Sequence, residues 1–295
     1  MGIKEVFYNS ITVNLPKNIV QLLLGAVLYC VLFGVIDWIG IIVAIIALSL
    51  SYSSVYIYND IIDREEDAAD PQKKAWKPVA NGSLSINGAL SLYALLLMGG
   101  VMISFFVNVI FGIMMVALLF LNFLHSSPWI HLKKKRVPTI INITVIEFIK
   151  YSSGWFALTS DTMRFPFLFV LMFSVIYTMG YTAYKFRFDG KTIKSNKIMF
   201  GVLGAITLLL FIGSLVTYTF PLPMIVMFIL SALIFGLRHM FWRSKKSFNQ
   251  MLVLEIILLP MLIVAFLLLN IPVFGDLNQQ IVDFFRTVLL PMVGL

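Results

Sequence analysis

The chain has 295 residues, of which 60% are hydrophobic and only 12% are charged. Soluble domains carry about 25% charged residues, so this composition excludes an ordinary soluble protein and predicts an integral, multi-pass membrane protein. The formal net charge of +8 then indicates attraction to anionic membrane lipids, and we expect no nucleic acid partner. The single cysteine, Cys30, excludes an internal disulfide or a cysteine-based metal cluster.

Apolar segments recur along the chain and are separated by polar connections. A helix needs about 20 apolar residues to cross the roughly 30 Å of hydrocarbon in a bilayer. We therefore expect an all-α fold, a polytopic membrane bundle of about nine transmembrane helices in one domain over residues 1–295. The expected helices cover residues 19–36, 38–58, 87–107, 109–124, 138–158, 165–184, 198–218, 222–237 and 251–270. The division at Asn108 cuts one long apolar stretch into two short helices.

Lysine and arginine are distributed unevenly between the two sides of this bundle. Of the 22 lysine and arginine residues, all but three fall on the side of the N-terminus. The exceptions are Arg164 and Arg286 on the opposite side and Lys150 inside a helix. Because cytoplasmic loops are enriched in these residues, the pattern predicts a cytoplasmic N-terminus and long connections on the cytoplasmic face.

The segment from residue 58 to residue 85 gathers charges that the rest of the chain avoids. Asn59, Asp63 and Asp67 recur every four residues, so on an α-helix they share one stripe, with Asp60 beside it. Stacked carboxylates repel one another unless a cation lies between them. Mg²⁺ takes one or two carboxylates together with waters and phosphate oxygens, so the spacing predicts a site for Mg²⁺ and a diphosphate.

The alternative for this segment is a solvated helix end, where clustered charge is ordinary. We favour the metal site because the acidic residues directly follow an apolar span. A second four-residue spacing occurs near the end of the sixth expected helix, where Tyr181, Lys185 and Asp189 share one helical stripe. The two stripes could face one cavity.

Several motifs of the chain resemble those of the UbiA-type intramembrane prenyltransferase superfamily. Residues 59–67, NDIIDREED, resemble its N-D-x-x-D-x-x-x-D signature. Residues 77–85, KPVANGSLS, look like the R-P-I/L-x-x-G-x-I/L-S/T segment that follows, and residues 125–128, HSSP, with Lys133 resemble the Y-S-x-P-P-x-x-x-K loop. The resemblance implies a UbiA-like bundle and Mg²⁺-dependent transfer of a prenyl group from an isoprenoid diphosphate to a lipophilic acceptor, either aromatic or a lipid.

The expected site residues follow from this resemblance and from the two stripes. The expected metal ligands are Asn59, Asp63, Asp67 and Asp189, and the expected catalytic group adds Asp60 and Lys185 to them. The expected substrate-binding residues are Lys73, Lys77, Lys133, Glu147, Lys150 and Tyr181.

The chain departs from the family's second motif, D-x-x-x-D, because Lys185 stands where the first aspartate is expected and only Asp189 matches. A lysine repels a metal ion, although its ammonium can contact a phosphate directly. Lys185 therefore either binds the diphosphate or prevents a second Mg²⁺ site. We favour the first interpretation because Lys191, Lys194 and Lys197 also crowd this loop.

Two further charged groups have alternative interpretations. Glu147 and Lys150 lie three residues apart inside the fifth expected helix, where charges are costly and face the protein interior. They either pair with each other or line the chamber that binds the acceptor. Lys133 belongs to the basic run 131–136, which either anchors the chain at the membrane surface or binds phosphate.

Two other functions remain open on the sequence alone. One is phosphoribosyl transfer to a polyprenyl phosphate, because the extended DPQKKAWKPVANG loop faintly resembles that branch of the superfamily. The other is a non-catalytic lipid-binding or transport protein on the same scaffold, which the altered second motif favours. The acceptor, the donor chain length and the oligomeric state do not follow from the sequence.

Overall fold

The computed structural model describes residues 15–34, 37–130, 132, 135–187 and 193–217. The chain divides into two compact units, Met1–Ala26 with Asp37–Phe220 and Val27–Ile36 with Pro221–Leu295. All contacts discussed below lie within the first unit.

Every described element of regular structure is helical, which confirms the all-α prediction. The helices are α2 (Leu15–Phe33), α3 (Trp38–Ile62), α4 (Arg64–Ala69), α5 (Pro71–Trp76), α6 (Ile86–Val107), α7 (Val109–Ser126), α8 (Arg136–Phe156), α9 (Phe167–Arg187) and α10 (Ile193–Thr217). Among the described residues, α3, α6, α7 and the part of α10 from Ile198 to Thr217 are long and apolar enough to cross a membrane. The expected helices at 222–237 and 251–270 lie outside the described residues.

The predicted division at Asn108 is confirmed, and the side chain of Asn108 explains it. Its backbone is fully extended, so it ends α6 and begins α7. Its Oδ1 accepts a hydrogen bond from the backbone N–H of Phe111 at 2.9 Å, which caps α7. Its Nδ2 donates to the carbonyl oxygen of Phe156 on α8 at 2.5 Å. One asparagine therefore both breaks the apolar stretch and ties the break to a neighbouring helix.

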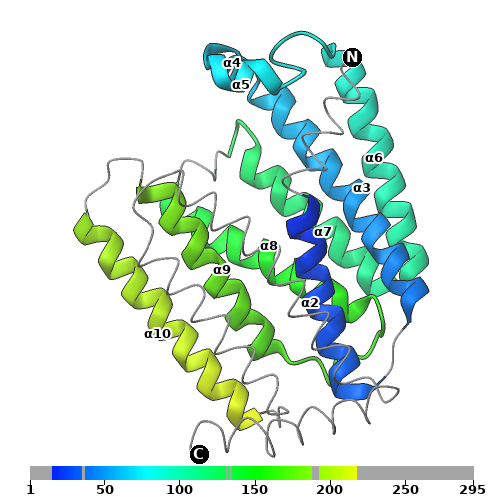
Figure 1. The fold of residues 1–295 in the computed structure, drawn as a ribbon, viewed down its shortest axis with the longest axis vertical. Helices are drawn as coiled ribbons and strands as arrows, with labels where there is room; N and C mark the ends of the chain where they lie inside the picture. The colour runs from blue at the N-terminus through cyan, green and yellow to red at the C-terminus, as the bar shows by residue number, and fades with distance from the viewer. Residues whose placement is uncertain (1–14, 35–36, 131, 133–134, 188–192, 218–295) are drawn as a thin grey trace, which may run out of the picture. The chain divides into compact units, whose positions relative to one another are not determined.

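Helices α3 and α6 pack side by side (Figure 1). Ile57 and Ile61, in the last turns of α3, share a buried cluster with Val79 and with Ala89 in the first turn of α6. The two helices are therefore antiparallel, and the connection between them, which carries α4 and α5, starts and ends on one side of the pair.

A glycine allows the close approach of α3 and α6. A Cβ atom at Gly100 would lie 2.7 Å from the backbone nitrogen of Ser51, whereas a Cβ at the adjacent Gly99 would meet nothing within 4 Å. We expect Gly100→Ala to destabilise the protein by about 1–3 kcal/mol, because α3 and α6 must move apart. Gly99→Ala is the matched control and should leave the thermal unfolding midpoint in detergent unchanged or slightly raised. Equal midpoints for the two variants would contradict this packing.

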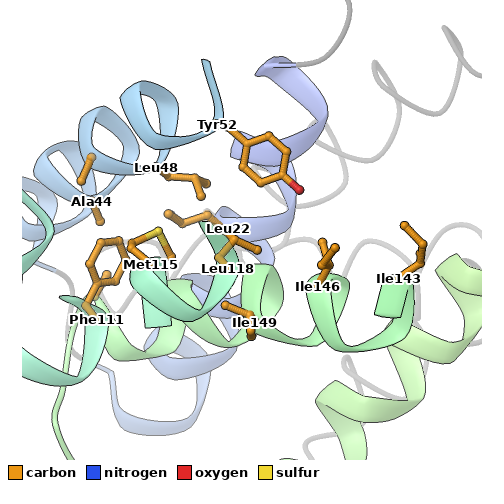
Figure 2. Close-up of a cluster of buried hydrophobic side chains, with 12 residues drawn as sticks. Leu22, Ala44, Leu48, Tyr52, Phe111, Met115, Leu118, Ile143, Ile146 and Ile149 are labelled. Atoms are coloured by element: carbon orange, nitrogen blue, oxygen red, sulfur yellow. The ribbon is translucent and has the colours of Figure 1, made fainter. Parts of the chain in front are cut away.

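A buried apolar cluster joins α2, α3, α7 and α8. Its members are Leu22, Ala44, Ala47, Leu48, Tyr52, Phe111, Met115, Leu118, Ile143, Ile146, Ile149 and Ala157. Figure 2 shows these side chains converging from the four helices. Ile146 and Ile149 flank the charged residues Glu147 and Lys150 in the chain, so these two charges lie beside an apolar core.

Candidate functional site

The acidic segment begins in the last turn of α3 and continues through a bend into α4. Helix α3 ends at Ile62, and Asp63 has φ −90° and ψ 7°, outside the helical region. The spacing of four nevertheless persists, because the N–H of Asp63 donates to the carbonyl oxygen of Asn59 at 2.9 Å and that of Asp67 to Asp63 at 2.8 Å. The sequence interpretation placed the three residues on one helix, whereas the structure joins two helices through Asp63.

Two lysines from the following connection reach back to this acidic segment. Lys77 Nζ lies 2.9 Å from Asp60 Oδ1 and 2.6 Å from Asp67 Oδ2, and Lys73 Nζ lies 3.1 Å from Asp67 Oδ1. The Asp67 side chain is only 3% exposed. We call Asp60, Asp67, Lys73 and Lys77 the ion-pair cluster. Helices α4 and α5 reverse the chain direction beyond the end of α3, which brings the lysines into contact with the aspartates (Figure 1).

Contacts within the ion-pair cluster shift the pKa values of Asp67 and Lys77 in opposite directions. Burial raises the pKa of the Asp67 carboxyl, but hydrogen bonds from Lys77 and Lys73 outweigh burial and leave this pKa below its ordinary value. Burial lowers the pKa of Lys77, but the charges of Asp60 and Asp67 outweigh burial and leave this pKa raised.

These shifts predict the pH range in which the ion-pair cluster stabilises the fold. The contribution of Asp67 is complete above its unfolded pKa of about 3.9 and is lost as pH falls through the lower folded pKa. The contribution of Lys77 is complete below about 10.4 and is lost as pH rises through the higher folded pKa. We expect Lys77→Met to have a lower unfolding midpoint than wild type near neutral pH, and we expect this difference to shrink outside these limits. A difference that peaks sharply within the range would contradict this assignment.

The residues around the cluster fit a magnesium ion held together with a diphosphate. The Oδ1 atom of Asn59 is buried and has no hydrogen-bond partner among the described residues, so it is free to bind a cation. Within the described residues, no group of three or more histidine, cysteine, aspartate or glutamate side chains could hold a metal ion. Mg²⁺ needs only one or two carboxylates when waters and phosphates complete its shell. Asn59, Asp63 and, once its lysines turn to phosphate, Asp67 would hold such an ion.

A second polar group lies inside the bundle, between α2, α3 and α8. Gln21 Nε2 donates to Glu147 Oε2, and Lys150 Nζ contacts Glu147 Oε1 at 2.5 Å and Asn18 Oδ1 at 3.3 Å. Asn18 Nδ2 donates to the Tyr56 hydroxyl at 3.1 Å. We call Asn18, Gln21, Tyr56, Glu147 and Lys150 the inner polar network. Glu147 and Lys150 therefore pair with each other, which is one of the two alternatives left open by the sequence, and the pair belongs to a larger set.

Helices α2 and α8 approach closely enough to build this network because both carry a glycine at the crossing. A Cβ at Gly25 would overlap the carbonyl oxygen of Tyr151, and a Cβ at Gly154 would overlap that of Leu22. The contact is therefore possible only without side chains at these positions.

Four other predicted site residues belong to α9 or to the connections that flank it and α8. Tyr181 is partly buried and packs against the apolar core cluster. Lys185 lies in the last turn of α9, one turn after Tyr181. Lys133 and Asp189 lie outside the described residues.

The sequence interpretation did not include three members of the inner polar network, Asn18, Gln21 and Tyr56, among the site residues. A signal for Gln21 was present, since it is a lone amide in the apolar run IVQLLLGAVLY, and polar residues inside membrane spans mark functional sites. Tyr56 had no such signal, because tyrosine is ordinary in an apolar helix.

Comparisons with solved structures find a similar helical fold. Solved structures with a similar fold include a UbiA homolog from Archaeoglobus fulgidus bound to GPP and Mg²⁺, at 16% identity and TM-score 0.65, covering 87% of this chain and 96% of that chain. A UbiA homolog from Aeropyrum pernix K1 in its apo form has 20% identity and TM-score 0.63, covering 88% and 99%. A structure of digeranylgeranylglyceryl phosphate synthase has 16% identity and TM-score 0.63, covering 92% and 99%.

No protein of curated function matches the chain in sequence. At the identities above, the solved structures establish the helical fold. The family itself is established by sequence, since residues 19–251 match the profile of the UbiA prenyltransferase family. The chain is an integral membrane protein that belongs to the UbiA prenyltransferase family.

Proposed function

We propose that this protein transfers a prenyl group from an isoprenoid diphosphate to a lipophilic acceptor in the membrane, and that the reaction depends on Mg²⁺. The observation that carries the proposal is the ion-pair cluster beside the unpartnered Oδ1 of Asn59. This group combines metal-binding oxygens with two ammonium groups of the kind that bind phosphate. We place it on the cytoplasmic face, in line with the excess of lysine and arginine in the long connections.

The residues of the chain have distinct tasks in this reaction. Breaking the allylic carbon–oxygen bond develops negative charge on the diphosphate, and a bound Mg²⁺ neutralises part of that charge. Lys77 and Lys73 donate to the phosphate oxygens once these replace the aspartates as their partners. The apolar helices surrounding the prenyl chain exclude water from the carbocation, which water would otherwise quench.

Two observations on relatives support the proposal. The structure of the UbiA homolog from Archaeoglobus fulgidus contains GPP and Mg²⁺, and a second structure of that homolog contains DMAPP and Mg²⁺. Both ligands are isoprenoid diphosphates, the donor class proposed for this chain.

The experiment that tests the function compares two labelled donors on the purified protein in lipid nanodiscs. We expect Mg²⁺-dependent release of diphosphate from a labelled prenyl diphosphate and none from labelled phosphoribosyl diphosphate. Release from the phosphoribosyl donor alone would identify the phosphoribosyl transferase instead. Tight binding of prenyl diphosphate without turnover for any acceptor would identify a non-catalytic lipid-binding protein.

Lys185 provides a separate prediction, because its two interpretations give opposite results. If its ammonium binds the diphosphate from the last turn of α9, Lys185→Ala should lower kcat/KM by roughly 10- to 150-fold. If instead it prevents a second Mg²⁺ site, Lys185→Asp should raise turnover by recreating D-x-x-x-D with Asp189. We expect the first outcome, and a several-fold gain for Lys185→Asp at saturating Mg²⁺ would overturn it.

A further inference from the structure

The inner polar network contains a buried acceptor atom that nothing in the described part of the chain satisfies. Gln21 is 3% exposed, and its Oε1 has no hydrogen-bond partner. The orientation of the amide is fixed, because its other atom, Nε2, donates to Glu147, and a carboxylate only accepts. A buried carbonyl without a donor is destabilising, so Oε1 is expected to meet a donor from outside the described part of the chain.

The ammonium group of the network, that of Lys150, already has its partners. Lys150, which is 1% exposed, contacts Glu147 Oε1 and Asn18 Oδ1. It also lies over the rings of Tyr52 and Tyr177, at 5.1 and 5.6 Å from their centroids. Lys150 is therefore held by an anion, an amide oxygen and two aromatic faces. Its role is to hold Glu147, which in turn holds the amide of Gln21.

A hydroxyl group both donates and accepts a hydrogen bond, and the inner polar network contains an atom for each of these bonds. Gln21 Oε1 accepts a hydrogen bond. The Tyr56 hydroxyl accepts from Asn18 and has a hydrogen of its own to donate. Asn18 and Gln21 lie on one face of α2, three residues apart. A ligand hydroxyl could donate to Gln21 and accept from Tyr56.

Along α3, the inner polar network lies on the side of the proposed diphosphate site that faces away from the ion-pair cluster. Tyr52, Tyr56, Asn59 and Asp63 recur at intervals of four, three and four residues, so they follow one face of α3 and its terminal residue. At about 1.5 Å per residue, Tyr56 lies about 4.5 Å from Asn59 along the axis, on the side away from the ion-pair cluster. That side is where a prenyl chain bound by its diphosphate would extend into the apolar interior.

We propose that Gln21 and Tyr56 bind the hydroxyl group of a lipophilic alcohol, which is the acceptor of the reaction. Glu147 and Lys150 are positioning residues that fix the Gln21 amide and do not themselves contact the acceptor. This inference rests on the proposed function, because only the proposed reaction makes the bound alcohol a prenyl acceptor. The binding site for the hydroxyl is measurable without the donor.

The test is a binding competition on the full-length protein in lipid nanodiscs. The probes are tritiated 1-dodecanol and its unlabelled O-methyl ether, each corrected for partition into empty nanodiscs. We expect the alcohol to bind about tenfold more tightly than the ether, because the ether cannot donate to Gln21. Gln21→Met, which keeps the shape of the side chain, should remove this preference, and Tyr56→Phe should reduce it.

Thr144→Val is the matched control, since it removes a hydrogen bond between α8 and α9, from Thr144 Oγ1 to Thr178 Oγ1 at 3.0 Å, that involves no member of the network. It should retain the full preference for the alcohol. Equal binding of alcohol and ether by the wild type would show that only water meets Gln21 and would overturn the proposal, whether or not the variants fold. A preference that persists in Gln21→Met would also overturn it.

The hydroxyl site and the proposed prenyl transfer can be contradicted independently of each other. A protein that releases diphosphate from a prenyl donor but shows no preference for the alcohol contradicts only this inference. A protein that prefers the alcohol but neither binds nor cleaves a prenyl diphosphate retains the hydroxyl site and contradicts only the prenyl transfer.

Discussion

Asp67→Asn is expected to lower Mg²⁺-dependent release of diphosphate from a prenyl donor by roughly 10²–10³-fold. The Asp67 carboxylate is almost fully buried and bonded to two lysines. In the proposed reaction it would bind the cation once these lysines turn to the phosphates. The amide keeps the shape of the side chain but removes its charge. The measurement is a continuous assay of released diphosphate at saturating donor and varied Mg²⁺.

The control for this variant is Glu66→Gln. Glu66 is the adjacent residue, it is exposed, and its substitution removes the same charge from the same short helix. We expect its activity to remain within about twofold of wild type, because an exposed charge contributes little. Near-normal release by Asp67→Asn, or an equal loss in both variants, would contradict a specific role for Asp67.

The second large effect is expected from Lys77→Met, which should raise the donor KM by about 10- to 100-fold with a smaller change in kcat. Lys77 is the only described residue whose ammonium contacts both Asp60 and Asp67. In the ligand-free protein it pairs with these carboxylates, and with donor bound we expect it to turn to the phosphates. Because this contact exists in ground and transition states alike, its loss appears mainly in KM.

The control is Lys74→Met, since Lys74 is exposed on α5. This change removes the same charge from the connection and should leave the donor KM unchanged. An unchanged KM in Lys77→Met would contradict a role in donor binding and would leave Lys77 with its ion pairs and with fixing the orientation of the chain in the membrane. A large rise in KM for Lys74→Met would show that the overall charge of the connection matters more than the geometry of Lys77.

Local patterns in the sequence predicted most of the fold. The apolar segments located α2, α3 and α6 to α10, with ends that differ from the expected ones by a few residues. The length and hydrophobicity of a segment predict a membrane-spanning helix, because in lipid the backbone N–H and C=O groups must form their hydrogen bonds within the helix. The turn at Asn108 was also predictable, since an asparagine can cap the helix that follows it.

Tertiary contacts account for what the sequence did not predict. The spacing of Asn59, Asp63 and Asp67 identified the acidic group, but it gave no indication that Lys77 reaches back to Asp67 across the bend at Asp63. Gln21 and Glu147 lie 126 residues apart in the chain. Their contact depends on the close crossing of α2 and α8, which no local pattern encodes.

The most direct test of the central claim is an experimental structure with Mg²⁺ and geranyl S-thiolodiphosphate, a donor analogue that resists cleavage. We expect a cation bound by the side chains of Asn59 and of Asp63 or Asp67. We also expect Lys77 Nζ to have moved from Asp60 and Asp67 to within hydrogen-bond distance of a phosphate oxygen. A diphosphate bound elsewhere, with Lys77 still paired to both aspartates, would contradict the central claim.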